Sequence, residues 1–178
     1  MKAFLLLAAL AALPPATRAA APCPAGGEDW SAACFTGQGE QRRVKPGYLD
    51  RLAWNAHGMA TILVAQPREL LAVDRKGRVV VPDIRHTGDF DYPDAEGGIG
   101  RFQAADGRCG YFAAGRFAIV IPATYDACKA FRGGEAEACT GCTSQCTDAD
   151  CHDTVLVGGS GVTLAPDGAV LLRQVLPR

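Results

Sequence analysis

Hydrophobic and polar positions between residues 107 and 139 predict one complete β-unit. Aromatic and β-branched residues dominate two short runs, at 111–112 and 117–121, and small residues separate them. Such runs favour strands, and small residues between them favour a tight hairpin turn. We expect Gly115 to hold this turn at a positive φ. Pro122 has no N–H to donate to a ladder, so we expect it to end the second strand.

The pattern of this unit recurs along the chain. The turn glycines Gly77 and Gly115 lie 38 residues apart, and the prolines Pro82 and Pro122 lie 40 apart. A glycine followed by a short strand stands at residues 58–62, 98–102 and 134–138. Pro166-Asp167-Gly168 marks one more hairpin turn near the C-terminus. Because a single hairpin cannot bury its apolar face alone, we predict an all-β domain of tandem antiparallel β-hairpins.

The first residues predict a cleavable signal peptide. Lys2 precedes an apolar run at 3–13, and small residues lead to Ala19, after which we expect cleavage. The run is shorter than the roughly 20 apolar residues of a membrane-spanning helix, so we expect no membrane span in the mature chain. The predicted organisation is a signal peptide at 1–19, a cysteine-clamped N-terminal segment at 20–43, and a β-repeat domain at 44–178 with a cysteine-rich insertion at 139–152.

Charge and cysteine content narrow the class of protein. The chain carries 18 basic and 19 acidic residues, a net charge of −1, and loss of Lys2 and Arg18 with the signal peptide makes it −3. This balance gives no electrostatic basis for binding nucleic acid or an anionic membrane surface. All eight cysteines lie beyond the expected cleavage point. An even number of cysteines in an exported chain predicts disulfides.

The best-preserved unit resembles a known family. Residues 107–111, Gly-Arg-Cys-Gly-Tyr, stand where WG repeats, also called KWG repeats, of bacterial proteins have Gly-Lys-Trp-Gly-Tyr. The Val-Ile-Pro exit at 120–122 and the Tyr125-Asp126 segment ending at Phe131 also match that family. The resemblance spans roughly residues 44–171, with Cys109 in place of the signature tryptophan. It implies an all-β interaction scaffold of a bacterial exported protein, periplasmic or extracellular, with no catalytic residues to transfer.

Four of the cysteines suggest two local disulfides. Cys23 and Cys34 flank Trp30 in a turn-prone segment, and we expect a disulfide between them to clamp the mature N-terminus. Cys109 and Cys128 belong to the same β-unit. If consecutive strands pair, these two residues come within the roughly 4.4–6.8 Å between Cα atoms that a disulfide requires.

The other four cysteines, Cys139, Cys142, Cys146 and Cys151, lie close together in a polar insertion beside His152. Four thiols at such spacing suit a structural zinc site, because thiolates bind zinc tetrahedrally. An oxidising compartment and a loop with almost no apolar residue favour two disulfides instead. Four cysteines allow three pairings, and we prefer Cys139 with Cys151 and Cys142 with Cys146. Zinc at all four is the alternative.

The insertion at residues 86–94 holds the other candidate binding residues. It places His86 and three carboxylates near two aromatic rings, a set that suits a calcium ion or a sugar. The candidate binding residues are Asp89, Asp91 and Tyr92. The spacing matches no EF-hand or zincin pattern. The simpler interpretation is a solvated loop with its aromatic rings packed on the array, in which case replacing Asp89 and Asp91 leaves folding intact.

No catalytic arrangement stands out in the sequence. None of the three serines, Ser31, Ser144 and Ser160, lies in a Gly-x-Ser-x-Gly elbow. We therefore expect a non-enzymatic exported scaffold without a cofactor, which binds a protein or a component of the cell envelope. The alternative is a small metal-binding or hydrolytic envelope protein that uses the cysteine cluster or the loop from His86 to Asp94.

Overall fold

The computed structural model describes residues 23, 30–86, 88 and 90–178. Its ordered elements are β-strands and a few short 3-10 helices, and every pairing between named strands is antiparallel. The predicted all-β, disulfide-stapled fold class is therefore confirmed. The predicted signal peptide at 1–19 lies outside the described residues.

The described residues form fourteen strands and four 3-10 helices. The strands are β1 (Phe35–Thr36), β2 (Arg43–Val44), β3 (Met59–Val64), β4 (Glu69–Asp74), β5 (Val79–Val81), β6 (Ile99–Gln103), β7 (Cys109–Ala113), β8 (Ala118–Tyr125), β9 (Ala127–Cys128), β10 (Ala136–Thr140), β11 (Thr143–Cys146), β12 (Thr154–Val157), β13 (Ser160–Leu164) and β14 (Val170–Val175). The 3-10 helices are η1 (Ala32–Cys34), η2 (Gly39–Gln41), η3 (Pro46–Arg51) and η4 (Glu96–Gly98). None of the helices in the described ranges is long and apolar enough to cross a membrane.

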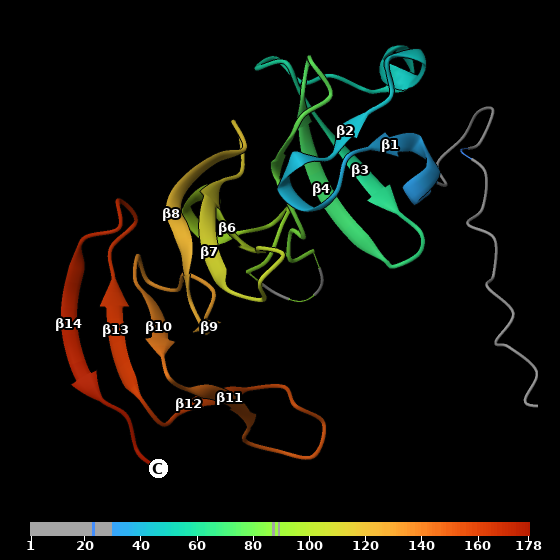
Figure 1. Cartoon of the computed structure of the whole chain (residues 1–178). Helices are drawn as coiled ribbons and strands as arrows, with labels where there is room; N and C mark the ends of the chain where they lie inside the picture. The colour runs from blue at the N-terminus through green and yellow to red at the C-terminus, as the bar shows by residue number, and fades with distance from the viewer. Residues whose placement is uncertain (1–22, 24–29, 87, 89) are drawn as a thin grey trace, which may run out of the picture.

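Three sheets follow one another along the chain. Sheet 1 has the order β3-β4-β5, and sheet 2 has the order β6-β7-β8. Sheet 3 has the order β14-β13-β10-β9, and the separate hairpin β11-β12 is inserted between β10 and β13. In each sheet a first strand pairs with a second and the second pairs with a third, in chain order. Figure 1 shows the three sheets in succession, from green through yellow to red.

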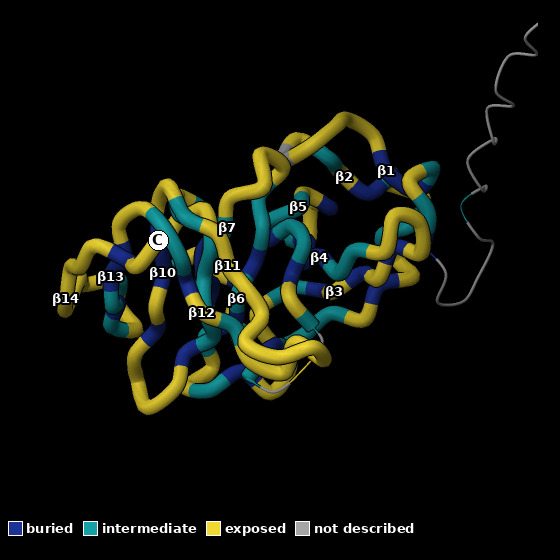
Figure 2. Tube along the Cα trace, turned by 90° about the horizontal axis from the view of Figure 1, so that it is seen from below, coloured by how far each residue is buried: buried dark blue, intermediate teal, exposed yellow. Residues whose placement is uncertain are grey.

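Apolar side chains fill the spaces between successive layers, where Figure 2 shows the buried part of the chain. The cluster between the N-terminal segment and sheet 1 includes Trp30, Phe35, Val44, Ala60, Ile62 and Leu71. The cluster between sheets 1 and 2 includes Ala72, Val81, Ile84, Phe102, Phe112 and Phe117. The cluster between sheets 2 and 3 includes Tyr111, Ile121, Phe131, Ala138, Val162 and Leu164. Each sheet is therefore covered by its neighbour in the chain, which removes apolar surface from water.

Strand β4 illustrates how this arrangement determines the burial pattern. Leu71 and Val73 belong to the cluster on one face of sheet 1, whereas Ala72 belongs to the cluster on the other face. All three side chains are fully buried. Because neighbouring residues of a strand point to opposite faces, a strand covered on both sides is apolar at every position. β3 has Ala60, Ile62 and Val64 buried in alternation with exposed residues, since only one of its faces is covered.

Tyr111 connects sheet 2 to sheet 3. Its fully buried ring packs edge-on against Phe131, with 5.0 Å between the ring centroids. Its hydroxyl donates a hydrogen bond of 2.8 Å to the carbonyl of Lys129. Lys129 follows β9 directly in the sequence and precedes Phe131 by two residues. Burial raises the pKa of the Tyr111 hydroxyl, so the group stays a neutral donor. Tyr111, one of the aromatic residues of the β-unit predicted at residues 107–139, is thus a core residue.

The predicted hairpin at the centre of the chain is formed by β7 and β8, but its second strand does not end at Pro122. Strand β8 continues through Pro122 to Tyr125. The ladder shifts register here, with Tyr111 opposite Ile121 and Cys109 opposite Tyr125. A bulge tolerates a proline because the missing N–H is not needed at that point. Gly110 faces the bulge, where a Cβ atom would lie 2.5 Å from the carbonyl oxygen of Ile121.

The predicted positive φ of Gly115 is wrong. Gly115 does not have a positive φ, whereas Phe117, at the end of the same turn, has a φ of 50°. A Cβ atom on Gly115 would meet no heavy atom within 4 Å. Gly77, at the turn between β4 and β5, does have a positive φ, of 73°. A Cβ atom there would lie 2.9 Å from Leu49 Cδ2.

The outer edge of sheet 1 is covered by the chain's own N-terminal segment. Strand β2 lies against the β4-β5 turn and β5, with the N–H of Val44 donating to Gly77 O at 2.9 Å and the N–H of Val79 donating to Arg42 O at 3.2 Å. A single isolated bridge joins Arg43 of β2 to Arg78, the residue before β5. The N-terminal segment therefore covers the beginning of β5, although β2 and β5 belong to separate sheets.

Candidate functional site

In the loop at residues 86–94, the carboxylate of Asp91 forms an ion pair with Arg101. The side chain of Asp91 is almost completely buried, with 5% exposed. Arg101 on β6 donates to Asp91 Oδ1 and Oδ2 at 2.7 to 2.9 Å, and its Nη1 also donates to the carbonyl of Cys128 at 2.9 Å. Asp91 therefore ties the loop to sheet 2 and, through Arg101, to β9 of sheet 3. The expectation that Asp91 can be replaced without affecting folding does not fit this burial.

The remaining residues of that loop do not form a shared ligand set in the described structure. Tyr92 is half-buried, with ring centroids 5.6 Å from Phe117 and 6.3 Å from Phe112, and burial raises the pKa of its hydroxyl. His86 Nε2 is buried without a hydrogen-bond partner in the described part of the chain. Asp89 lies outside the described residues. No group of three potential metal ligands occurs among the residues that the structure describes.

Two disulfides join the predicted partners. Cys23 pairs with Cys34, with 4.9 Å between Cα atoms, and Cys109 pairs with Cys128, with 6.0 Å between Cα atoms. Cys109 lies on β7 of sheet 2 and Cys128 lies on β9 of sheet 3. The second disulfide is therefore a covalent link between the two sheets.

The preferred connectivity of the cysteine cluster is wrong. The structure joins Cys139 to Cys142 and Cys146 to Cys151, with Cα atoms 6.0 and 4.7 Å apart, instead of Cys139 to Cys151 and Cys142 to Cys146. Strand β11 runs from Thr143 to Cys146. An extended chain rises about 3.3 Å per residue, so Cys142 and Cys146 are about 13 Å apart, too far for a disulfide. Gly141, at a φ of 66°, turns the chain so that Cys142 returns to Cys139.

The zinc alternative for the same cysteines does not fit this structure. All eight cysteines are described, and none of them is free. Zinc binds thiolates, and a sulfur atom in a disulfide carries no such charge. The two disulfides instead close the two ends of the inserted hairpin β11-β12. Cys139, on β10, is fully buried and packs with Leu156 and Leu176. The cluster stabilises a polar insertion that has little core of its own.

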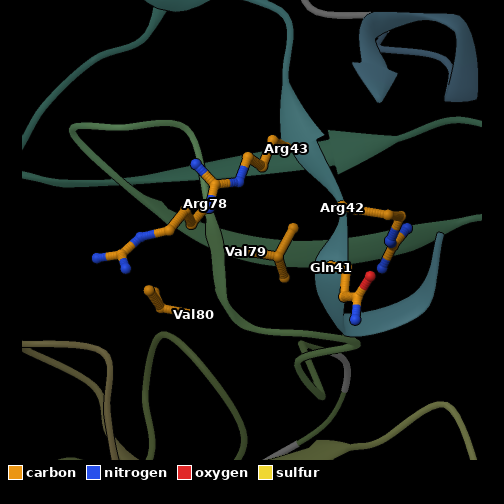
Figure 3. A pocket seen from close by; sticks show the side chains of 6 residues that line it. All are labelled: Gln41, Arg42, Arg43, Arg78, Val79 and Val80. Carbon is orange, nitrogen blue, oxygen red and sulfur yellow. The ribbon is translucent and has the colours of Figure 1, made fainter. Parts of the chain in front are cut away.

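A cleft of about 560 Å³ lies where β2 meets β5, and it is lined by Gln41, Arg42, Arg43, Arg78, Val79 and Val80. Figure 3 shows the side chains of Arg42 and Arg78 pointing in opposite directions from it. Arg42 binds Glu69 through two contacts of 2.5 and 2.7 Å, and Arg78 binds Asp74 at 2.6 Å.

These pairings determine the electrostatics of the cleft. The hydrogen bond that Arg42 donates to Glu69 raises the pKa of Arg42, although burial acts in the opposite direction. Burial acts to raise the pKa of Glu69, but the hydrogen bond and charge of Arg42 outweigh it and leave that pKa below its ordinary value. Two of the three arginines are thus neutralised by carboxylates. The cleft offers a structural ion pair network rather than a strong anion site.

The most unusual surface is the edge of sheet 3. All six residues of β14 are exposed. Four of them are large and apolar, with exposed fractions of 38% for Val170, 53% for Leu171, 54% for Leu172 and 88% for Val175. β14 pairs with β13 on one side, and the sheet order places no described strand on the other side. Figure 1 shows it as the outermost red strand, and Figure 2 shows it exposed along its length.

This edge has the properties that natural edge strands usually lack. Exposed edges are commonly blunted by charges, by proline or by shortness, because their free N–H and C=O groups attract other strands. β14 has six residues, one charge, at Arg173, and no proline, and its single irregularity against β13 is a bulge at Leu171. A hollow of about 410 Å³ lies beside β14, and its lining includes Tyr125, Thr140 and Val175. The arrangement can accept an additional strand through backbone hydrogen bonds and apolar side chains.

The sequence predicted a strand here but did not indicate a site. A signal was present: Val170, Leu171 and Leu172 form an apolar run without alternation. Such a run predicts a strand covered on both faces. Only the structure reveals that the side chains of β14 are exposed and that no strand of the described residues pairs with its outer edge.

No protein-family model matches this chain, and neither a curated protein nor a solved structure is similar to it. The edge of β14 is therefore identified as the candidate site from its geometry.

Proposed function

We propose that this chain is a non-enzymatic, exported scaffold of WG-type β-repeats that binds a protein or a component of the cell envelope along strand β14. The observation that carries the proposal is the exposed apolar edge, with Leu171 and Leu172 both more than half exposed. Burying such side chains on a partner strand contributes on the order of 1 kcal/mol or more for each residue.

The three-sheet architecture supports the repeat part of the proposal. Sheets 1 and 2 are three-stranded with the same order, and β10, β13 and β14 repeat that order in sheet 3. An apolar cluster separates each sheet from the next. In such arrays the terminal units need a polar outer surface to remain unassociated. The apolar edge at the end of this array indicates association.

Export is supported by the cysteine pairing. All eight cysteines form disulfides, which persist in oxidising compartments and are rare in the cytosol. The proposed location is the periplasm or the extracellular space of a bacterium. The cleavable signal peptide at 1–19 is part of the same proposal.

Ion pairs between arginines and carboxylates support the proposal that the protein is not an enzyme. Asp91 is held by Arg101, Glu69 by Arg42, and Asp74 by Arg78. The arginine partners hold the pKa of Glu69 and that of Asp74 below their ordinary values, although burial acts in the opposite direction. A carboxylate whose lone pairs are occupied by an arginine is a poor general base. Their arrangement supports structural roles.

A capture experiment from envelope extract tests the proposal. The baits are the intact exported protein, its Leu172→Lys variant, and an Ile119→Lys control in which the same change is made at a residue of β8 that is 47% exposed. We expect the parent and the control to retain the same envelope component and the Leu172→Lys variant to lose it. Retention by all three baits, or by none, would overturn the proposal.

A further inference from the structure

We propose that the strand accepted by β14 is β14 of a second copy of this chain. The two strands pair antiparallel, with Leu172 of one copy opposite Leu172 of the other, and join two four-stranded sheets into one sheet of eight strands. This inference rests on the proposed function, because it names the partner of the same edge. It commits to a closed, two-fold symmetric dimer.

The first argument is the contrast with sheet 1. There β2 of the same chain covers the beginning of β5, with Val44 N donating to Gly77 O at 2.9 Å, Val79 N donating to Arg42 O at 3.2 Å, and one bridge between Arg43 and Arg78. The corresponding third strand of sheet 3, β14, receives no strand from the described residues. β14 is six residues long, about 20 Å, with a bulge at Leu171, so an added strand gains ladder hydrogen bonds along the regular part from Leu172 to Val175.

The second argument is the symmetry of the strand's own composition. A two-fold axis perpendicular to a sheet makes two identical edge strands antiparallel and places one residue directly opposite itself. A register centred on Arg173 would place two like charges opposite each other, which is destabilising. The register centred on Leu172 avoids this. It puts two leucines in contact and places Leu171 opposite the aliphatic stem of Arg173.

The third argument is charge complementarity at the ends of β14. Asp167 lies in the turn before the strand and Arg178 lies beyond its end, and both residues are exposed. In an antiparallel pairing, the end of β14 that leads to Arg178 in one copy lies beside the beginning of β14, next to the turn with Asp167, in the other. Two-fold symmetry produces this pairing of opposite charges twice. A parallel arrangement would instead bring each charge level with its own copy.

The faces of the sheet also match in this arrangement. Leu172 lies opposite Thr163 on β13, and Thr163 lies opposite Glu137 on β10, so the three share one face. Arg173 shares the other face with Val162 and Ala138. Pairing through Leu172 extends both rows into the second copy without moving either sheet. The side chains of β14 that are exposed in the single chain then pack beside the side chains of β14 in the second copy.

The solution mass of the purified exported protein tests the inference. We expect light scattering to give twice the chain mass for the parent and for the Ile119→Lys control. The Leu172→Lys variant places two lysines opposite each other and is expected to have the mass of a single chain. Circular dichroism checks that both variants fold. A folded Leu172→Lys variant that keeps the mass of two chains would overturn the inference.

A cross-linking experiment tests the register independently. A Leu172→Cys variant places two thiols at directly opposed positions and is expected to form a disulfide-linked dimer on a non-reducing gel. An Ile119→Cys variant, which adds a cysteine of similar exposure on β8, is expected to stay a monomer on that gel. Equal cross-linking of the two variants, or none in either, would contradict the Leu172-centred pairing.

The two proposals fail in distinguishable ways. If the parent has the mass of a single chain at the highest concentration reached, while capture from envelope extract still depends on Leu172, the partner is a foreign strand. The inference then falls and the proposed function stands. If neither the mass nor the capture depends on Leu172, both fall.

Discussion

Arg101 holds the buried carboxylate of Asp91 through contacts of 2.7 to 2.9 Å and donates a further hydrogen bond to the carbonyl of Cys128. One guanidinium therefore joins the loop that carries Asp91 to sheet 2 and to β9 of sheet 3. Only 5% of the Asp91 side chain and 22% of the Arg101 side chain are exposed. Removal of either partner would leave a largely buried charge without compensation.

Replacing Asp91 is therefore expected to destabilise the fold. We expect Asp91→Ala to lower the free energy of unfolding by on the order of 3 kcal/mol, because it leaves Arg101 largely buried and unpaired. Urea unfolding of the disulfide-intact protein measures this change. Asp94→Ala, at an exposed position of the same loop, is the control and should unfold like the parent. An Asp91→Ala variant as stable as the parent would show that the ion pair contributes little.

Acid is expected to weaken the pair between Glu69 and Arg42. The pKa of Glu69 is lowered in the folded chain, so its contribution to stability is present above the unfolded-state pKa, about 4.3, and is lost as the pH falls through the folded-state pKa. We expect Glu69→Gln to reduce the loss of stability between pH 6 and about pH 3. Urea midpoints across that window measure the difference. Asp106→Asn, whose side chain is 61% exposed, should keep the pH dependence of the parent.

Glycine is expected to be required at position 77 and not at position 115. Gly77 has a φ of 73°, and a Cβ atom would lie 3.0 Å from the carbonyl oxygen of Val44. Gly77→Ala should therefore cost about 1–2 kcal/mol from backbone conformation alone. Gly115→Ala meets open space and should leave the melting temperature within a degree or two of the parent. Equal losses in the two variants would contradict this assignment.

The disulfide between Cys109 and Cys128 is expected to matter more than the one between Cys146 and Cys151. The first links two sheets across 19 residues of sequence, whereas the second closes five residues of an exposed loop. Replacing both Cys109 and Cys128 by serine should cost about 3 kcal/mol, because loop entropy in the unfolded chain grows with loop length. Replacing both Cys146 and Cys151 should cost clearly less. Melting temperatures compare the two double variants.

Peptide mapping under non-reducing conditions tests the connectivity itself. We expect no alkylatable thiol in the oxidised protein, because all eight cysteines are paired. Cleavage between Cys142 and Cys146 should separate the cluster into two peptides, since no disulfide crosses that point. Peptides that stay linked until reduction would restore the pairing of Cys139 with Cys151.

Short-range features could be predicted because their physical causes lie within a few residues. The hairpin of β7 and β8 follows from two β-branched and aromatic runs around a small-residue turn. The pair of Cys23 and Cys34 follows from closeness in sequence. The disulfide connectivity among the four cysteines between Cys139 and Cys151 could not be predicted in this way, because it depends on β11 being extended. Nothing in the spacing from Cys142 to Cys146 alone distinguishes a strand from a tight loop.

The sequence by itself determined the all-β class, the positions of most strands and the likelihood of disulfides, since these depend on local propensity and composition. Only the tertiary structure decided which polar side chains are buried and which strand edge is left without a partner. Asp91 became a core ion pair because Arg101, on a different strand, faces it. β14 became the candidate site because β2 covers the beginning of β5, whereas no described strand lies along the outer edge of β14. Burial and edge exposure depend on the neighbours that the topology provides.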